Sequence, residues 1–185
     1  ITVTAANGDN QDYTITVVRQ DKEPDPTPEP DPEPTPDPEP DVAYPGFSTT
    51  VSVDEDEKYI SGLTVSDYVQ DVLDKIDNYN GAYSKILNKN GNEKDVLVST
   101  GDILITYNSS GEEVSRYEIV IYGDVNGDGE IDLFDFAQIK RSILGIADPS
   151  GVYWKAADCN RDGELDLFDF AKVKRYILGI GSINQ

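Results

Sequence analysis

An acidic pattern that occurs twice near the end of the chain restricts its fold more than any other feature. Residues 123–136 read GDVNGDGEIDLFDF, and residues 157–170 read ADCNRDGELDLFDF. In both copies, oxygen-bearing side chains stand at alternate positions, and a glycine follows the third of them. A solvated acidic surface would not require glycine and asparagine at matching places. The repeat therefore indicates that each copy encloses a cation.

The spacing is that of a calcium-binding loop of the EF-hand kind. Ca²⁺ is a hard cation that takes six to eight oxygen ligands, and such a loop supplies them from positions 1, 3, 5, 7, 9 and 12, with glycine at position 6. The first frame has Gly129 at this turn and the second has Gly163. The predicted ligands of two calcium ions are Asp124, Asn126, Asp128, Glu130, Asp132 and Asp135 in the first loop, and Asp158, Asn160, Asp162, Glu164, Asp166 and Asp169 in the second.

The positions of each loop are expected to ligate in different ways. The side chains at positions 1, 3, 5 and 12 should bind the ion directly, position 7 should offer its backbone carbonyl, and position 9 should act through a water. Ile131 and Leu165, two places past each turn glycine, are expected to join the paired loops through a short strand contact and to pack in the core.

An amphipathic helix is expected to leave each loop. The two segments, LFDFAQIKRSILGI and LFDFAKVKRYILGI, should end as helices near Gly145 and Gly179. The helix that usually enters an EF-hand loop is expected to be missing, because the strand-like run YEIVIY leads directly into the first loop. The apolar stripe assigned to the core consists of Phe136, Ile139, Ile143, Leu144, Phe170, Val173, Ile177 and Leu178.

These two loop-helix units, with a Lys-Arg pair in each helix, resemble a type I dockerin over about residues 123 to 181. The resemblance implies an all-α module that folds on calcium and docks through its helices onto a cohesin domain. In that way it would join an enzyme or another component to a bacterial scaffold such as a cellulosome. The partner-binding residues that the resemblance implies are Leu133, Phe134, Lys140, Arg141, Leu167, Phe168, Lys174 and Arg175.

Other roles stay open for these eight residues. Many family members carry small hydroxyl residues where this chain has Leu-Phe, which points to a more apolar contact and a different cohesin class. The Leu-Phe pairs would otherwise pack in the helix core, and the Lys-Arg pairs would be cations placed favourably near a helix C-terminus. Because both copies keep the same set, we expect the module to bind its cohesin in two orientations related by a half-turn.

A proline-rich tract separates the first residues of the chain from the rest. From Glu23 to Pro40, proline occupies every second position among Glu, Asp and Thr. Proline lacks an amide donor and pushes the preceding residue toward extended conformations. The segment 22–43 is therefore predicted to be a linker, extended over about 55 Å if it adopts polyproline II at roughly 3.1 Å per residue. Use as a docking ligand is the alternative, although the usual basic or aromatic flanks are missing.

Residues 1–21 are predicted to form a β-hairpin. Two runs rich in β-branched residues, 1–4 and 13–18, are separated by the turn-rich NGDNQD. A single hairpin is marginal in water, so these strands are expected to complete a sheet that begins further upstream. They resemble the last strands of the cadherin-like or immunoglobulin-like β-sandwich modules of bacterial surface proteins.

The middle segment, residues 44–122, is predicted to be a small α+β or β-rich domain. Thr64 and Asp67 form a potential capping box for a helix with the apolar stripe Val65, Tyr68, Val69, Val72, Leu73 and Ile76. The strand-like runs are FSTTVSV, AYSKIL, DVLV, ILITY and YEIVIY. We expect one helix on a mainly antiparallel sheet. The segment runs into the first loop without a linker and resembles the X modules that precede some dockerins, with independent carbohydrate binding as the alternative.

Composition excludes several classes of function. A net charge of −21 over 185 residues argues against nucleic acid and anionic membrane as partners. No apolar run approaches the roughly 18 residues that a membrane-spanning helix needs. The chain has no histidine and one cysteine, Cys159, so nucleophilic or acid-base catalysis has little support. We therefore expect no enzyme activity in this region.

The prediction is a calcium-dependent protein-interaction module in a secreted or cell-surface bacterial protein, with the four-part division 1–21, 22–43, 44–122 and 123–185. Its partner would be a cohesin domain of a scaffoldin or surface protein. The alternative is a C-terminal tail that calcium only rigidifies and that binds no cohesin. The chain is expected to be part of a longer protein, since its first residues read as a strand.

Overall fold

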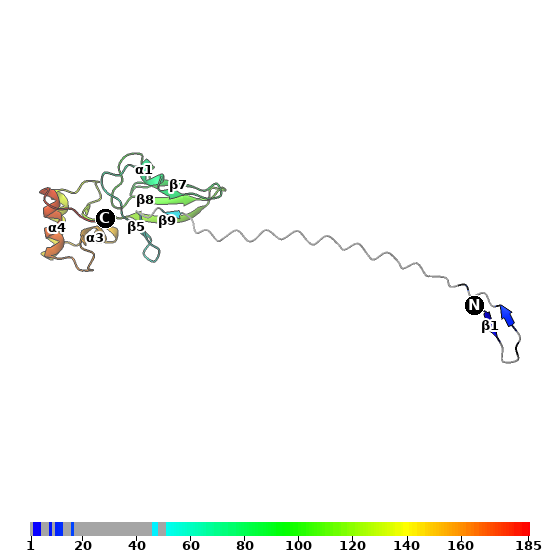
Figure 1. Cartoon of the computed structure of the whole chain (residues 1–185). Helices are drawn as coiled ribbons and strands as arrows, with labels where there is room; N and C mark the ends of the chain where they lie inside the picture. Colours follow the sequence, from blue (N-terminus) through cyan, green and yellow to red (C-terminus); the bar gives the residue numbers. More distant parts are fainter. Residues whose placement is uncertain (1, 5–7, 9, 13–15, 17–45, 48–50) are drawn as a thin grey trace. The chain divides into compact units, whose positions relative to one another are not determined.

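The computed structural model describes residues 2–4, 8, 10–12, 16, 46–47 and 51–185 (Figure 1). Its internal contacts divide the chain into two units, residues 1–39 and residues 40–185. The predicted proline-rich linker lies outside the described residues, as does most of the predicted second strand at 13–18.

In the first unit, β1 (Thr2–Thr4) pairs antiparallel with β2 (Asn10–Asp12), and Thr4 lies opposite Asn10. The predicted hairpin is present, but its second strand starts inside the stretch NGDNQD, which was predicted to be the turn. Pairing at Asn10 closes a shorter loop than pairing at residue 13 would, and the entropic cost of closure rises with loop length.

The second unit contains a five-stranded sheet in the order β4-β5-β9-β8-β7. All neighbouring strands are antiparallel except β5 and β9, so the prediction of a mainly antiparallel sheet is confirmed. A separate antiparallel pair joins β3 (Gly46–Phe47) to β6 (Ile76–Asp77). The strands of the sheet are β4 (Ser52–Asp54), β5 (Tyr59–Ser61), β7 (Tyr83–Leu87), β8 (Ile103–Tyr107) and β9 (Glu113–Ile119).

The helix predicted from Thr64 onward is much shorter than expected. Thr64 does donate from its backbone nitrogen to Asp67 Oδ2, at 2.7 Å. However, Tyr68 is extended and forms an isolated β-bridge with Leu97, so α1 covers only Val69–Leu73. This bridge is also all that the predicted strand DVLV contributes, since Leu97 is its third residue. A pairing partner distant in sequence therefore overrides the helical periodicity of this stretch.

The sheet packs its inner face against α1. Ile60, Leu63, Val72, Leu104 and Ile119 are completely buried in this first core. Tyr117 and Ile119 of β9 are buried on either side of the exposed Glu118, as expected for a strand with one face on the core, whereas the three central residues of β8 are all buried. The chain then leaves β9 through Val120 and Ile121, which are also fully buried, and enters the first loop.

Apart from α1, the helices of the second unit gather at one end, beside the sheet (Figure 1). They are α2 (Leu133–Ile143), α3 (Val152–Ala157) and α4 (Leu167–Ile177). The second core contains Ile139 of α2 and Val173 of α4, both completely buried, together with Val120 and Tyr122 from the end of the middle segment. The helices therefore share a core with the segment that precedes them.

Both exit helices start and end close to where the sequence predicts. Asp132 and Asp166 are the N-cap residues of α2 and α4, each in a capping box with the aspartate three residues later. The last turns close with Gly145 and Gly179 in the left-handed region, at φ 64° and 67°.

Three other expectations for this part are wrong. The six-residue α3 ends directly at Asp158, so the second loop does have an entering helix. Leu144 and Leu178, assigned to the core, are 61% and 59% exposed, because each helix turns at the following glycine before its last leucine can be covered. Ile131 and Leu165 pack against the second core as expected, but no strand pairing joins them.

Candidate calcium loops and partner-binding surface

The first predicted ligand, Asp124, lies in the polypeptide turn that follows the sheet and is completely buried. Its Oδ1 accepts hydrogen bonds from the backbone nitrogens of Gly127 and Asp128, at 2.9 and 3.2 Å. Its Oδ2 accepts from the backbone nitrogen of Thr100, at 2.9 Å. The carboxylate therefore lies where the loop folds over it, between that loop and the middle segment.

The last predicted ligand of the first loop, Asp135, is also completely buried. Its Oδ1 accepts from Val125 and Asn126 at 2.8 and 3.0 Å, and its Oδ2 accepts from the backbone nitrogen of Asp132 at 2.9 Å. These bonds tie the two ends of the loop to the first turn of α2. The loop is thus closed on itself by its own carboxylates.

The second loop repeats part of this arrangement. Asp169 accepts from the backbone nitrogens of Asn160 and Asp166, both at 3.0 Å. Asp158 Oδ1 accepts from Asp162 at 3.2 Å, as in the first copy. Asp158 Oδ2, however, accepts from Gly163 of its own loop at 2.9 Å and not from another segment.

The loops bury the negative charge of several carboxylates. Burial, and then the charges of Asp135 and Asp128, raise the pKa of Asp124 to about 6. Burial also raises the pKa values of Asp135 and Asp169. Within the described part of the chain, no Lys or Arg forms an ion pair with a loop carboxylate. Buried carboxylates in this state are stabilised by a cation, and an all-oxygen donor set suits Ca²⁺.

The side chains of the predicted ligands do not form a complete ion-binding site. Among the described residues, no group of three or more acidic, histidine or cysteine side chains is placed to hold an ion. Asn126 Nδ2 donates to Asp128 Oδ2 at 2.7 Å, and Asn160 does the same to Asp162 at 2.6 Å. Loops of this kind also use amide, carbonyl and water oxygens, so the donor set fits calcium. The assignment of the twelve ligands remains a prediction.

The residues implied as partner contacts lie on the surface. Leu133 and Phe134 are 67% and 70% exposed at the start of α2, and Leu167 and Phe168 have the same values at the start of α4. The alternative that these pairs pack in the core is therefore wrong. The Lys-Arg pairs, Lys140, Arg141, Lys174 and Arg175, lie exposed in the last turns of the two helices.

The exposed apolar surface extends beyond the residues predicted from the sequence. Ile146 and Ile180 are 61% and 64% exposed and adjoin the exposed Leu144 and Leu178. The repeated ILGI at the end of each unit was the available signal. In each copy, an apolar pair at the start of the helix is thus matched by a second one past its end.

The start of one helix lies beside the end of the other. Leu133 and Phe136 of α2 line a hollow of about 190 Å³ together with Lys174, Ile177 and Leu178 of the second copy. A candidate contact surface therefore combines residues of both copies.

Contacts between α3 and the middle segment were also not foreseen. Lys155 forms an ion pair with Glu57, and its Nζ lies 4.8 Å from the centre of the Tyr59 ring. At the end of the chain, the Gln185 side chain accepts from the backbone nitrogen of Tyr122 at 2.8 Å and donates to its carbonyl at 3.0 Å. The helical part is thereby attached to the preceding segment at several points.

Two loop-helix units that end in capping glycines, with duplicated acidic loops, define a calcium-loop protein-interaction module. Comparison with protein-family models agrees: residues 122–178 match the dockerin type I domain. This part of the chain is a type I dockerin domain, a non-catalytic module of a family that binds calcium and cohesin domains. No curated protein matches the chain. None of the helices in the described residues is long and apolar enough to cross a membrane.

Proposed function

We propose that this chain docks onto a cohesin domain of a scaffoldin or surface protein, and that it does so only with calcium bound. The observation that carries the proposal is the exposure of two identical Leu-Phe pairs, at equivalent positions of the duplicated unit. Large apolar side chains with Arg nearby are typical of the centre of a protein interface. The complex would assemble outside the cell, in a secreted or surface-attached multi-component system.

Calcium dependence has an electrostatic basis. Each loop carries five acidic side chains, so the small module concentrates ten of them, and two Ca²⁺ ions would add four positive charges. An ion that binds only the folded loops adds its binding free energy to the stability of the fold. Without the ions, the surface formed by α2 and α4 would not be held in shape for a partner.

The middle segment is proposed to support the dockerin domain as an X-module-like unit. The shared second core, the ion pair of Lys155 with Glu57, and the bonds of Gln185 to Tyr122 support this role. Carbohydrate binding by the middle segment has less support. The rings of Tyr83 and Tyr107 stack on each other with centroids 5.2 Å apart, so each ring leaves at most one face open to a sugar.

The test is calorimetric titration of the chain with a panel of purified cohesin domains of different classes, with calcium and with a chelator. We expect a complex with at least one class in calcium and none in chelator. The matched control is a variant with Leu133, Phe134, Leu167 and Phe168 all changed to Ala, which should keep its calcium and lose the complex. If calcium binds and no cohesin class does, the chain is instead a calcium-rigidified tail.

A further inference from the structure

The two calcium loops differ in how their first ligand is held. Asp124 Oδ2 is bonded by Thr100 of the middle segment at 2.9 Å, whereas Asp158 Oδ2 is bonded by Gly163 of its own loop at 2.9 Å. Thr100 lies 24 residues before Asp124. The first loop is therefore completed by a piece of another part of the fold, and the second loop is not.

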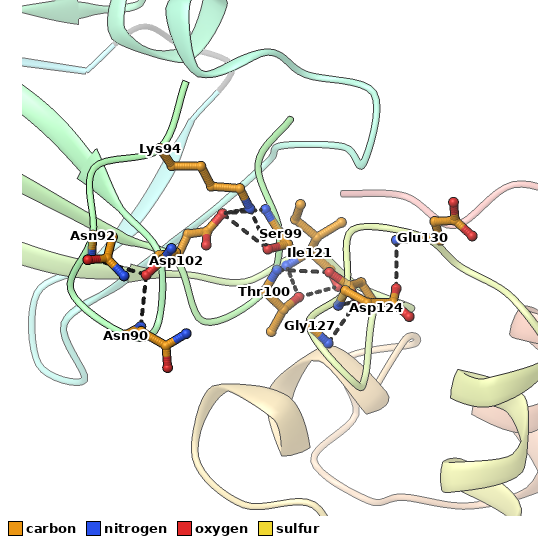
Figure 2. A network of polar contacts seen from close by, with 12 residues as sticks. Asn90, Asn92, Lys94, Ser99, Thr100, Asp102, Ile121, Asp124, Gly127 and Glu130 are labelled. Carbon is orange, nitrogen blue, oxygen red and sulfur yellow. Dashed lines mark hydrogen bonds and ion pairs between the residues drawn. The ribbon is translucent and has the colours of Figure 1, made fainter. Parts of the chain in front are cut away.

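The segment that carries Thr100 is held rigidly. We call residues 98–102 (VSTGD) the supporting turn. The buried carboxylate of Asp102 accepts from the backbone nitrogen of Ser99 at 2.7 Å and from its hydroxyl at 3.1 Å, and it pairs with Lys94 Nζ at 2.5 Å (Figure 2). Charged hydrogen bonds of this kind, largely removed from water, keep the backbone of the turn in one conformation.

Thr100 is fixed from the opposite side as well. Its hydroxyl donates to the carbonyl of Ile121 at 3.2 Å and accepts from the backbone nitrogen of Ile121 at 3.1 Å. Ile121 stands three residues before Asp124. One short stretch therefore carries both the backbone groups that bond the Thr100 hydroxyl and the predicted ligand that Thr100 holds. Figure 2 shows Thr100 between the group formed by Lys94, Ser99 and Asp102 and the carboxylate of Asp124.

The supporting turn and the first loop come close together at Gly127, and the sequence reflects this contact. A Cβ on Gly127 would lie 2.5 Å from the Thr100 carbonyl oxygen and 2.7 Å from Cε1 of Tyr153. The equivalent residue of the second loop is Arg161, which adopts nearly the same left-handed backbone, φ 62° against 69°, and is exposed. Backbone conformation alone therefore does not demand glycine at position 127. Glycine is needed because the supporting turn packs so closely on the loop that a side chain has no room.

We propose that the supporting turn is an outer part of the first calcium site, which positions Asp124 for the ion, and that calcium binding in this loop is coupled to the packing of the middle segment on the dockerin domain. The inference rests on the proposed binding of calcium at Asp124. Partners that orient a metal ligand change metal affinity by about 10–100-fold when they are removed. Coupling is reciprocal, so calcium in the first loop should tighten the junction by the same factor.

Two variants of the full chain test the proposal. Gly127→Arg gives the first loop the residue of the second loop and displaces the supporting turn. Thr100→Ala removes both hydroxyl bonds to Ile121 without touching the loop. We expect each to weaken calcium binding in the first loop, by about 10-fold or more for Gly127→Arg, while the second loop keeps its affinity. The matched controls are Arg161→Gly and Thr100→Ser, which should bind both ions as the unchanged chain does.

Calcium titrations followed by NMR separate the two loops through the amide signals of Gly129 and Gly163. A second readout is hydrogen exchange at the Thr100 amide, which calcium should slow in the unchanged chain and slow less in Gly127→Arg. If the unchanged chain binds no ion in the first loop, the proposed calcium function of that loop fails. If it binds two ions and both variants leave the affinities of the two loops unaltered, only the coupling is refuted. An equal loss in both loops would also refute it.

Discussion

The ring of Phe136 in α2 stacks on the ring of Phe170 in α4, with centroids 4.1 Å apart and an interplanar angle of 23°. The two residues occupy the same position in the two copies of the duplicated unit. The copies therefore meet through identical side chains, as in a symmetric dimer, where one patch contacts its own copy. The two Leu-Phe pairs, three and two residues before these rings, are exposed to the same extent, 67% for each Leu and 70% for each Phe.

Loss of the stacked pair should destabilise the dockerin domain. Phe136→Ala is expected to lower the free energy of unfolding by about 2–4 kcal/mol, toward the low end for Phe→Ala because the ring is only partly buried. Urea unfolding in calcium measures the change. Phe134→Ala is the control, because that ring is 70% exposed and its removal should cost less than about 0.5 kcal/mol. Equal losses in the two variants would contradict the role of the stack.

Each Leu-Phe pair should be dispensable alone if the module binds in two orientations. Leu133→Ala with Phe134→Ala should lower cohesin affinity only a few-fold, and so should the equivalent change of Leu167 and Phe168. Changing all four should lower it at least about 100-fold, since apolar anchors dominate interface energy. Surface plasmon resonance in calcium measures all three variants. A large loss from the first pair alone rejects binding in two orientations.

Removal of calcium should loosen residues 123 to 181. We expect a chelator to reduce the helical circular dichroism signal and calcium to restore it, because the loop carboxylates repel one another without an ion. At a calcium concentration 100 times the dissociation constant, each site stabilises the fold by about 2.7 kcal/mol. Magnesium is the control ion, since it demands a smaller octahedral site and should restore less signal. A signal that stays unchanged in chelator would argue against coupled folding.

The residues after the family match should also contribute to stability. Ile183 is 7% exposed, and a Cβ on Gly123 would lie 2.7 Å from its Cδ1, so it covers the start of the dockerin domain. Ile183→Ala should cost about 2–3 kcal/mol, at the lower end of the range for buried Ile→Ala. Ile180→Ala, at a side chain that is 64% exposed, is the control and should be nearly neutral. Thermal unfolding of both variants in calcium provides the comparison.

Much of the secondary structure of the dockerin domain could be predicted from the sequence, because the sequence signals for its loops and helix ends are local. The frame of each loop, the caps at Asp132 and Asp166, and the ends at Gly145 and Gly179 all depend on residues a few positions apart. Ligand spacing, capping and left-handed glycines act within one or two turns of chain. The exit helices could therefore be predicted closely.

The fold of the middle segment could be predicted less closely from the sequence, because its strand pairings are not local. The parallel contact of β5 with β9, and the bridge of Tyr68 with Leu97 that shortens α1, join residues far apart in the chain. The helical periodicity of the segment after Thr64 was real, but propensity is weak against a tertiary partner. The entering helix α3 was missed because VYWKAA is too short to show a period.

By itself, the sequence determined that two acidic loops recur in one frame and that a capped helix follows each, since both depend on covalent spacing. Only the tertiary structure decided which apolar residues of those helices face outward, because periodicity marks a stripe but not what covers it. It also decided that Thr100, rather than a residue of the loop, holds Asp124 Oδ2. That contact depends on how a distant turn packs against the loop, and no local pattern specifies such packing.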